Sequence, residues 1–252
     1  MLIFCMHIEF LPEPKIKSET RAKLRTTSTA TITTALYKRG FRNQMIQGVT
    51  PVGAGKAEAM VGPAYTLRYI PAREDLNGLE VFRDPAHPQR KGVEECPEGH
   101  VMVIDSRKDA SAASAGGILV TRLMVRGVEG VVSDDGFRDS PEIGAMKIHA
   151  YHARPSAPTN LTRHQAIDLN VPIGCGDAPG FPGDIIVGDG EGVVVMPAHL
   201  ADEIADEAVE MTAYEDFVTE RVQGGATITG LYPPTDPANL DLFAEWRAKH
   251  DR

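Results

Sequence analysis

The sequence has few cysteines, no long apolar run and no excess of positive charge. Its 252 residues contain three cysteines, Cys5, Cys96 and Cys175, an odd number at wide spacing. This pattern fits neither a disulfide framework nor a Cys-x-x-Cys metal site, and it predicts a reducing, cytoplasmic location. No apolar stretch approaches the roughly 20 residues that a membrane helix needs, so no membrane partner is expected.

Several common function classes lack their signals as well. The net charge of −9 argues against nucleic-acid binding, which needs clustered Lys and Arg. Neither a phosphate-binding Gly-x-x-x-x-Gly-Lys-Ser/Thr loop nor a Gly-x-Gly-x-x-Gly turn is present, so a nucleotide cofactor is unsupported. There is no Gly-x-Ser-x-Gly elbow for a serine hydrolase. His149 and His152 fall in a predicted strand, where positions i and i+3 face opposite sides, and they do not suggest a metal site.

The remaining pattern alternates helices and strands. Residues 1–14 are apolar but contain Glu9 and lack a basic start, which predicts a strand or a loose tail rather than a signal peptide. Two helices are expected over 18–41, with Ser28 or Thr29 as an N-cap. The other expected elements are strands at 58–71 (with a break at Gly62-Pro63), 100–106, 128–135, 147–153 and 170–176, a hairpin at 184–197, and helices at 115–127, 140–146, 199–225 and 236–250.

Two features of this pattern carry spatial predictions. The strand–helix–strand order over 100–135 predicts a parallel strand pair. The polar segment 72–99 contains three prolines and predicts a long surface excursion, and such loops are often functional. Arg68, Arg73 and Arg83 border it and could contact the distal end of an acidic substrate, although solvated surface arginines are commoner. Cys175 is expected to be a buried structural thiol.

One strand is followed by a dense group of charges. The stretch "SDDGFRDS" supplies Asp134, Asp135, Arg138 and Asp139 directly after the apolar residues 131–132. A carboxylate at a strand end can bind a hard cation such as Mg²⁺, and an adjacent Arg can hold a carboxylate by forked hydrogen bonds. The alternative is a polar turn with a surface ion pair, which spacing alone would favour.

A second group of residues starts a helix. In "SAGGILV", residues 114–120, two glycines open a helix right after a strand, which leaves backbone N–H groups free to attract an anion. The glycines could instead merely begin a buried helix.

The segment "GGILVTRLMVRGVEGVVSDDGFRD" resembles the signature of a family that contains class II pyruvate aldolases of the 4-hydroxy-4-methyl-2-oxoglutarate type and the regulator of ribonuclease activity A (RraA). "TSTATITTAL", "MVGPAYT", "HVMVIDS" and "FPGDIIVGDGEGVVVMP" agree in order, so the likeness covers about 24–205. It implies an α/β chain with an RraA-like β/β/α swivelling-domain fold at 24–205, an N-terminal segment at 1–23 and a helical extension at 206–252. It also implies homotrimers or homohexamers with sites between subunits.

The resemblance also implies roles for particular residues. Arg138 would bind the oxo and carboxylate oxygens of a small 2-oxo acid, and Asp139 would ligate Mg²⁺ or Mn²⁺. The amides of Gly116, Gly117, Ile118 and Leu119 would hold the substrate carboxylate. The family pattern begins with an Asp that positions the catalytic base, 21 positions before the Arg. That position is Gly117 here, so this carboxylate is absent.

The missing Asp bears on the reaction. Retro-aldol cleavage must remove a hydroxyl proton and needs a base, whereas decarboxylation of oxaloacetate needs only the metal and Arg138. Asp134, Asp135, or Glu191 of a neighbouring subunit are candidate replacements, although each is more typical of a turn or rim.

The sequence therefore predicts a metal-dependent lyase that cleaves or decarboxylates a 2-oxo acid. Two alternatives stay open. One is a non-catalytic, protein-binding regulator of the ribonuclease-inhibitor type. The other is an aldolase or dehydratase-like enzyme for sugar-acid derivatives, with the excursion shaping a larger pocket.

Overall fold

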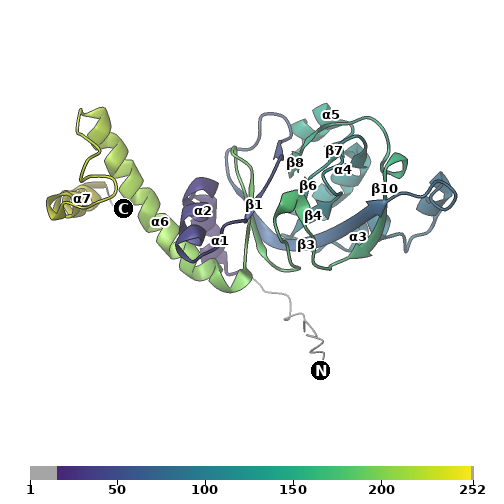
Figure 1. Cartoon of the computed structure of the whole chain (residues 1–252), viewed down its shortest axis with the longest axis horizontal. Helices are drawn as coiled ribbons and strands as arrows, with labels where there is room; N and C mark the ends of the chain where they lie inside the picture. Colours follow the sequence, from purple (N-terminus) through teal and green to yellow (C-terminus); the bar gives the residue numbers. More distant parts are fainter. Residues whose placement is uncertain (1–15, 251–252) are drawn as a thin grey trace, which may run out of the picture.

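The computed structural model describes residues 16–250, so the predictions for Cys5 and for residues 1–14 lie outside the described part of the chain. Within it, the strands form one large mixed sheet and one small parallel sheet, and helices pack around them (Figure 1). The chain is therefore mixed α/β, as the sequence predicts. None of the helices between residues 16 and 250 is long and apolar enough to cross a membrane.

Two N-terminal helices cover one end of the large sheet. They are α1 (Ser18–Arg25) and α2 (Thr29–Lys38), as predicted. The Ser28 hydroxyl accepts a hydrogen bond from the Thr31 backbone N–H at 3.1 Å and satisfies one of the free donors at the start of α2. Ile32 and Leu36 of α2 are buried in the same apolar cluster as strands of the sheet. This burial fixes both helices to the body.

The long strand β3 (Met60–Pro71) organises the large sheet. Its first residues pair with β11 (Ile185–Gly188), its middle runs parallel to β4 (Val101–Asp105), and its end pairs with β10 (His164–Leu169). The expected break at Gly62-Pro63 is wrong, because the ladder to β11 continues through both residues. Gly62 is needed for close approach instead, since a Cβ there would lie 2.5 Å from the Gly99 carbonyl oxygen.

The strand order of the large sheet is β1-β12-β11-β3-β4-β6-β8-β2, with β10 on β3, and it forms a half-barrel. Strands β3, β4, β6 and β8 run parallel, so the predicted parallel pair is confirmed. Helices α3, α4 and α5 lie in the connections between them. The bounds not yet given are β1 (Met45–Ile46), β2 (Thr50–Pro51), β6 (Gly130–Ser133), β8 (His149–His152), β12 (Val193–Met196), α3 (Pro88–Glu95), α4 (Gly117–Val125) and α5 (Ser140–Ala145).

The segment 170–176 differs from its prediction. It is not a strand: Ile173 makes one isolated bridge to Gly180, and a 3₁₀ turn, η3 (Cys175–Asp177), follows. The Asp105 carboxylate accepts a hydrogen bond from the Gly174 N–H at 3.0 Å, so a side chain satisfies backbone that a ladder would otherwise pair. The strand that directly precedes this segment in the chain is β10, and the sequence analysis did not predict it. Cys175 is buried, as predicted.

The C-terminal helices form an extension from the body (Figure 1). Helix α6 (Ala201–Gln223) buries Ile204 and Ala208 in the cluster that contains α1 and α2, and its far half leaves the body. There Phe217 packs on Phe243 and Trp246 of α7 (Pro237–His250), with ring centroids 5.6 and 6.0 Å apart. The expected boundary at residue 205 falls inside α6. The other short helices are η1 (Leu79–Arg83), η2 (Asn160–Thr162) and η4 (Ala198–Leu200).

Candidate functional site

A small sheet brings the two predicted groups of site residues together. Strands β5 (Ala113–Ala115), β7 (Gly136–Phe137) and β9 (Arg154–Pro155) run parallel. Parallel strands end at the same edge, so the residues that follow β5 and β7 leave the sheet side by side. The Arg138 N–H donates to the Ala115 carbonyl at 3.1 Å and holds this alignment. Strands this short gave no recognisable sequence pattern.

The start of α4 touches the Arg-Asp pair directly. The Gly117 N–H donates to Asp139 Oδ2 at 3.0 Å, and Arg138 Nε lies 3.7 Å from the same oxygen. Gly116 precedes the helix, and a Cβ there would lie 2.6 Å from Arg138 Cγ, so glycine allows the Arg side chain to pack across it. The N–H groups of Ile118 and Leu119 are first-turn donors without an acceptor inside the helix.

Asp139 adopts a conformation that aims its carboxylate at α4. Its φ is +58° and ψ is +32°, the left-handed region that Asp tolerates better than most residues. It precedes α5 but makes no capping hydrogen bond to it. The Asp139 carboxylate therefore faces the α4 start, and its side chain is 40% exposed.

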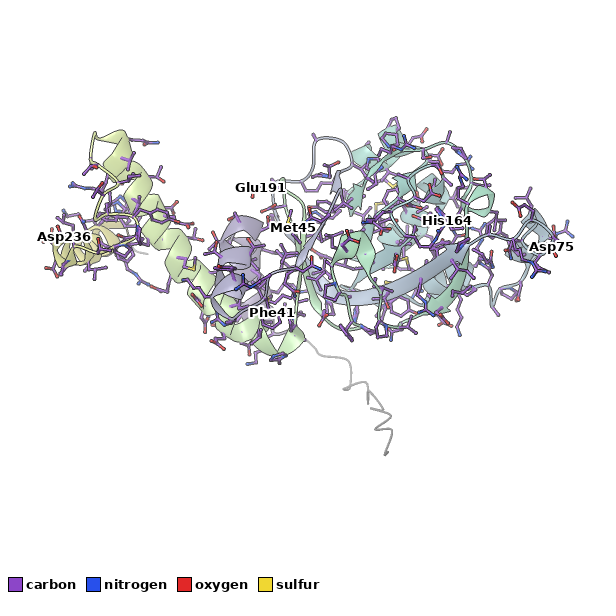
Figure 2. All side chains as sticks on the ribbon, in the orientation of Figure 1. Phe41, Met45, Asp75, His164, Glu191 and Asp236 are labelled. Atoms are coloured by element: carbon purple, nitrogen blue, oxygen red, sulfur yellow. The ribbon has the colours of Figure 1, made fainter. Side chains whose placement is uncertain are left out.

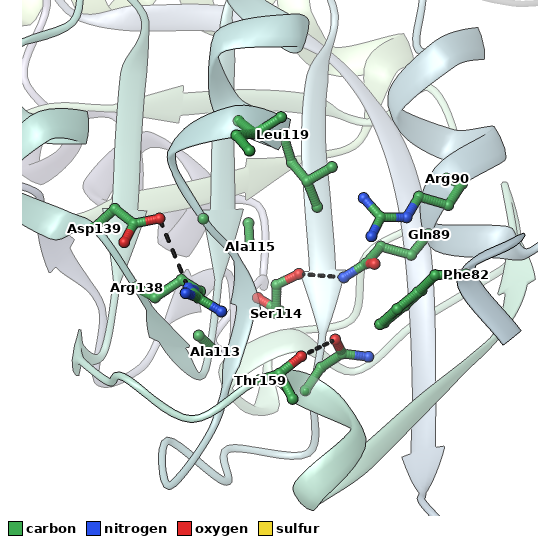
Figure 3. A pocket seen from close by; sticks show the side chains of 13 residues that line it. Phe82, Gln89, Arg90, Ala113, Ser114, Ala115, Leu119, Arg138, Asp139 and Thr159 are labelled. Carbon is green, nitrogen blue, oxygen red and sulfur yellow. Dashed lines mark hydrogen bonds and ion pairs between the residues drawn. The ribbon is translucent and has the colours of Figure 1, made fainter. Parts of the chain in front are cut away.

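These residues form one side of a pocket of about 230 Å³ (Figure 3). This side, here called the glycine wall, consists of Gly116, Ile118, Leu119, Arg138 and Asp139. Thr159 and Asn160 also line the pocket, next to Ala113 and Ser114 of β5. Pockets for drug-sized ligands measure roughly 300–1,000 Å³, so this one suits a smaller molecule.

The opposite side comes from the predicted surface excursion. This excursion wall consists of Phe82 from η1 and of Gln89 and Arg90 from α3 (Figure 3). Gln89 is buried and fixes the wall, because its amide donates to the Ser114 carbonyl at 2.7 Å and to Tyr69 Oη at 3.0 Å.

Sequence reasoning missed Arg90 and named its neighbours instead. Arg68 forms an ion pair with Asp168, and Arg73 forms one with Asp75 at 2.7 Å. Neither these two nor Arg83 lines the pocket. Pro88, at the first position of α3, was the signal in the sequence that the excursion contains a helix. A helix would have placed Arg90 on one defined face, directed either toward the body of the protein or toward solvent.

A buried polar cluster lies directly behind the glycine wall. Asp135 Oδ1 lies 2.6 Å from both Ser114 Oγ on β5 and Ser133 Oγ on β6, and Asp135 Oδ2 lies 3.2 Å from His164 Nε2 on β10. Asp135 and His164 are fully buried. Burial raises the pKa of Asp135, and the contacts with His164 and the two serines oppose that shift. Asp135 thus links the strands that carry the two halves of the site.

Asp134 makes a different set of hydrogen bonds from Asp135. Its carboxylate accepts hydrogen bonds from the backbone N–H groups of Ser106, Lys108 and Gly176 at 2.7, 3.2 and 3.0 Å. Burial raises its pKa to about 6, although these hydrogen bonds act in the opposite direction. Asp134 and Asp135 form the bend between β6 and β7, as expected of turn residues, but they are 2% and 0% exposed, so the expectation that they lie at the rim is wrong.

Glu191 lies in the hairpin turn after β11, where its N–H donates to Asp189. Figure 2 shows it near Met45, well away from His164, which marks the region behind the pocket. Within residues 16–250, no group of three or more His, Cys, Asp or Glu side chains is arranged to hold a metal ion. Any cation at Asp139 would therefore depend on other oxygen donors.

Comparisons with known proteins identify the family and agree with this fold. A family model described as RraA-like, aldolase/RraA, matches residues 29–195. A protein of Halalkalibacterium halodurans, "Putative 4-hydroxy-4-methyl-2-oxoglutarate aldolase", is 30% identical over 164 residues, which cover 65% of this chain and 71% of that one. "Protein DlpA" of Legionella pneumophila is 22% identical over 231 residues, which cover 89% of this chain but only 36% of DlpA.

A solved structure shares the fold. Streptomyces coelicolor RraAS2, described as an unusual member of the RNase ES inhibitor RraA protein family, superposes with a TM-score of 0.72 at 27% identity, covering 82% of this chain and 98% of that one. The resemblance read from the residues and the fold that it implied are thereby confirmed. The chain belongs to the RraA-like, aldolase/RraA family.

Proposed function

We propose that the protein is a divalent-metal-dependent lyase that acts on a small 2-oxo acid, by oxaloacetate decarboxylation, by retro-aldol release of pyruvate, or both. One observation carries the proposal: Arg138, Asp139 and the start of α4 meet at one end of a single pocket. The relatives named as aldolases support a lyase of this class.

The chain's own groups suit a 2-oxo acid. The substrate carboxylate would accept hydrogen bonds from the first-turn N–H groups of Ile118 and Leu119, where the helix dipole also favours an anion. The Gly117 N–H is engaged by Asp139, so it is not available for the substrate. Arg138 would hold the 2-oxo oxygen and stabilise the negative charge that develops on it.

Asp139 would hold the cation, and the protein around it fits Mg²⁺ or Mn²⁺. Its carboxylate is partly exposed, and one of its oxygens already accepts the Gly117 N–H. Mg²⁺ commonly binds through one or two carboxylates and keeps several waters, so a site with a single protein carboxylate suits it. When bound, such an ion polarises the carbonyl oxygen of a substrate as a Lewis acid.

The groups near the site favour decarboxylation over aldol cleavage. Gly117 supplies no carboxylate, and Asp134 and Asp135 are buried in other hydrogen bonds. Retro-aldol cleavage needs a base for the hydroxyl proton, whereas loss of CO₂ does not. Among the described residues that line the pocket, Asp139 is the one carboxylate, which leaves Glu191 of a neighbouring subunit as the remaining candidate for the base.

The test is consumption of oxaloacetate with and without added Mg²⁺ or Mn²⁺, compared with Arg138→Ala. We expect metal-dependent turnover that falls by roughly 10²- to 10³-fold in the variant, as when one transition-state donor is removed. Arg83→Ala is the matched control, because Arg83 does not line the pocket. Turnover no greater than that of Arg138→Ala would disprove the proposal.

Gly117→Asp tests the argument about the missing base. A Cβ at Gly117 would lie 3.4 Å from Asp139 Cβ and 3.5 Å from Asp139 Oδ2, so a side chain there would point beside the proposed metal ligand. We expect aldol cleavage to rise more than decarboxylation. Equal changes in the two rates would contradict the assignment of a base to this position.

A second function is favoured by two observations. The chain lacks the carboxylate at Gly117, and it shares its fold with a protein of the RNase ES inhibitor family. A protein-binding regulator would retain the fold without needing a metal. Titration with Mn²⁺, followed by the relaxation of water protons, separates the two: binding that is lost in Asp139→Asn supports the lyase, and no binding supports the regulator.

A further inference from the structure

The excursion wall presents a cation to the pocket from the side opposite Arg138. Arg90 of α3 and Arg138 both line the pocket and come from opposite walls (Figure 3). Arg90 is only partly exposed. A ligand held at the glycine wall would therefore have its far end directed toward a second guanidinium.

Arg90 is held in place by an aromatic ring rather than by an acid. Its Cζ lies 4.5 Å from the centroid of the Phe82 ring, a cation–π contact that orients the guanidinium while its donors stay available. Phe82 in turn packs edge-on against the buried His87, with centroids 5.2 Å apart.

The other arginines near the pocket differ from Arg90 in their partners. Arg122 pairs with Glu94, Arg163 with Asp109 and Arg68 with Asp168. Over residues 16–250, no carboxylate forms an ion pair with Arg90. A guanidinium that is partly buried in a pocket and lacks an acidic partner is suited to an anionic group of a ligand.

We propose that Arg90, positioned by Phe82, is a specificity-determining residue that binds a second carboxylate at the end of the substrate remote from its 2-oxo acid group. The protein then prefers 2-oxo dicarboxylates to 2-oxo monocarboxylates of the same length. This inference rests on the proposed function for the orientation of the ligand, but it can be measured without turnover.

The experiment compares two ligands that differ only at the distal end. 2-Oxoglutarate and 2-oxopentanoate each have five carbons, and neither carries the 4-hydroxyl group needed for retro-aldol cleavage. Their dissociation constants are measured by titration calorimetry in the presence of Mg²⁺, for the wild type, Arg90→Leu, Arg90→Lys and Phe82→Leu. Arg83→Leu serves as the matched control, because it removes the same charge from the same excursion outside the pocket.

We expect the wild type and Arg83→Leu to bind 2-oxoglutarate roughly 10- to 100-fold more tightly than 2-oxopentanoate, the range expected for a hydrogen-bonded charged group. Arg90→Leu should remove this preference and leave the affinity for 2-oxopentanoate within about twofold of the wild type. Arg90→Lys should restore part of the preference, and Phe82→Leu should reduce it.

Three results would overturn the inference. They are an unchanged preference in Arg90→Leu, an equal loss of affinity for both ligands, and an absence of preference in the wild type. Failure of oxaloacetate turnover with an intact, Arg90-dependent preference would instead count against the lyase and leave the specificity role standing.

Discussion

The two walls of the pocket are built in different ways. The glycine wall follows two parallel strands, β5 and β7, and a fully buried polar cluster around Asp135 holds those strands from behind. The excursion wall belongs to a 28-residue connection, segment 72–99 of the sequence, and is fixed mainly by one buried amide, Gln89, and by the packing of Phe82.

This difference separates two requirements of the proposed site. Groups that stabilise developing charge must be held to within fractions of an ångström, and buried hydrogen bonds between strands provide that rigidity. Groups that recognise the distal end of a ligand need only reach it, so a surface connection can carry them. In the proposed function, the scaffold would thus fix the chemistry, and the excursion would determine which substrate fits.

The largest expected loss of stability comes from a substitution in the buried polar cluster behind the glycine wall. Asp135→Asn replaces a fully buried carboxyl group that faces His164 and two serine hydroxyl groups. Breaking a buried pair by removing one partner costs about 3–5 kcal/mol, and we expect a loss of that size in the free energy of unfolding. Urea denaturation measures it.

An exposed ion pair between β3 and β10 offers the matched control. Asp168 pairs with Arg68 where both side chains are more than a third exposed. Asp168→Asn should change the free energy of unfolding by at most about 1 kcal/mol. If the two substitutions cost the same, the contrast between the buried cluster behind the glycine wall and an exposed ion pair would not hold.

Asp134 makes the free energy of unfolding depend on pH. Its pKa is raised from 3.8 to about 6 in the folded protein, so the folded state keeps this proton after the unfolded chain has lost it. The free energy of unfolding should therefore fall as pH rises from about 4 to about 6, by at most about 3 kcal/mol from this group, and the full contribution is present only below pH 4.

Asp134→Asn removes this dependence, because an amide does not titrate. The variant loses hydrogen bonds at every pH, but its deficit relative to the wild type should be largest near pH 4 and smaller at pH 7. Urea midpoints at pH 4.5, 5.5 and 7 give the comparison. A deficit that is constant across these values would show that Asp134 ionises at its ordinary pKa.

A smaller effect, on catalysis, is expected when a glycine at the start of α4 is replaced by alanine, which adds a single methyl group. A Cβ at Gly116 would lie 2.6 Å from Arg138 Cγ and would displace that side chain, whereas a Cβ at Gly117 meets nothing closer than 3.4 Å. We expect Gly116→Ala to lower kcat/KM for oxaloacetate by roughly 10- to 100-fold, since catalysis is sensitive to misplacement of this order. Gly117→Ala should lower it by less than about threefold. The reverse order would mean that Arg138 does not depend on the glycine beside it.

Much of the glycine wall could be predicted from the sequence. The chemistry of Arg138 and Asp139 and the open start of α4 were visible as residue types at fixed spacing, and their proximity followed from the resemblance to a family. The strands that align them, β5 and β7, are three and two residues long. So few residues give no periodic signal, and pairing over that length depends on tertiary contacts.

The excursion wall could not be predicted in the same way. The sequence predicts that segment 72–99 is a surface excursion of a kind that is often functional, but which of its arginines faces the pocket depends on how α3 packs against β10 and β5. Arg68, Arg73 and Arg83 have the same chemistry as Arg90 and differ from it only in position. Likewise, the burial of Asp134 and Asp135 depends on segments that are distant in sequence. The N–H of Gly176 in the turn η3 donates to Asp134, and His164 of strand β10 faces Asp135.

The smallest expected effect concerns an exposed ion pair between α4 and α3, the helices that contribute to the two walls. Arg122 of α4 pairs with Glu94 of α3 through two nitrogens, Nε at 3.0 Å and Nη2 at 2.7 Å from Oε2, and both side chains are exposed. Arg122→Ala should lower the free energy of unfolding by at most about 1 kcal/mol, and less at high salt, because solvent screens the pair. It should also leave the preference between 2-oxoglutarate and 2-oxopentanoate within about twofold of the wild type, since Gln89 and Phe82, not this pair, position Arg90. The exchange Arg122→Glu with Glu94→Arg is the control, because it keeps an ion pair between the same helices. A loss of ligand preference in Arg122→Ala that the exchange restores would mean that the excursion wall is held in place from the protein surface.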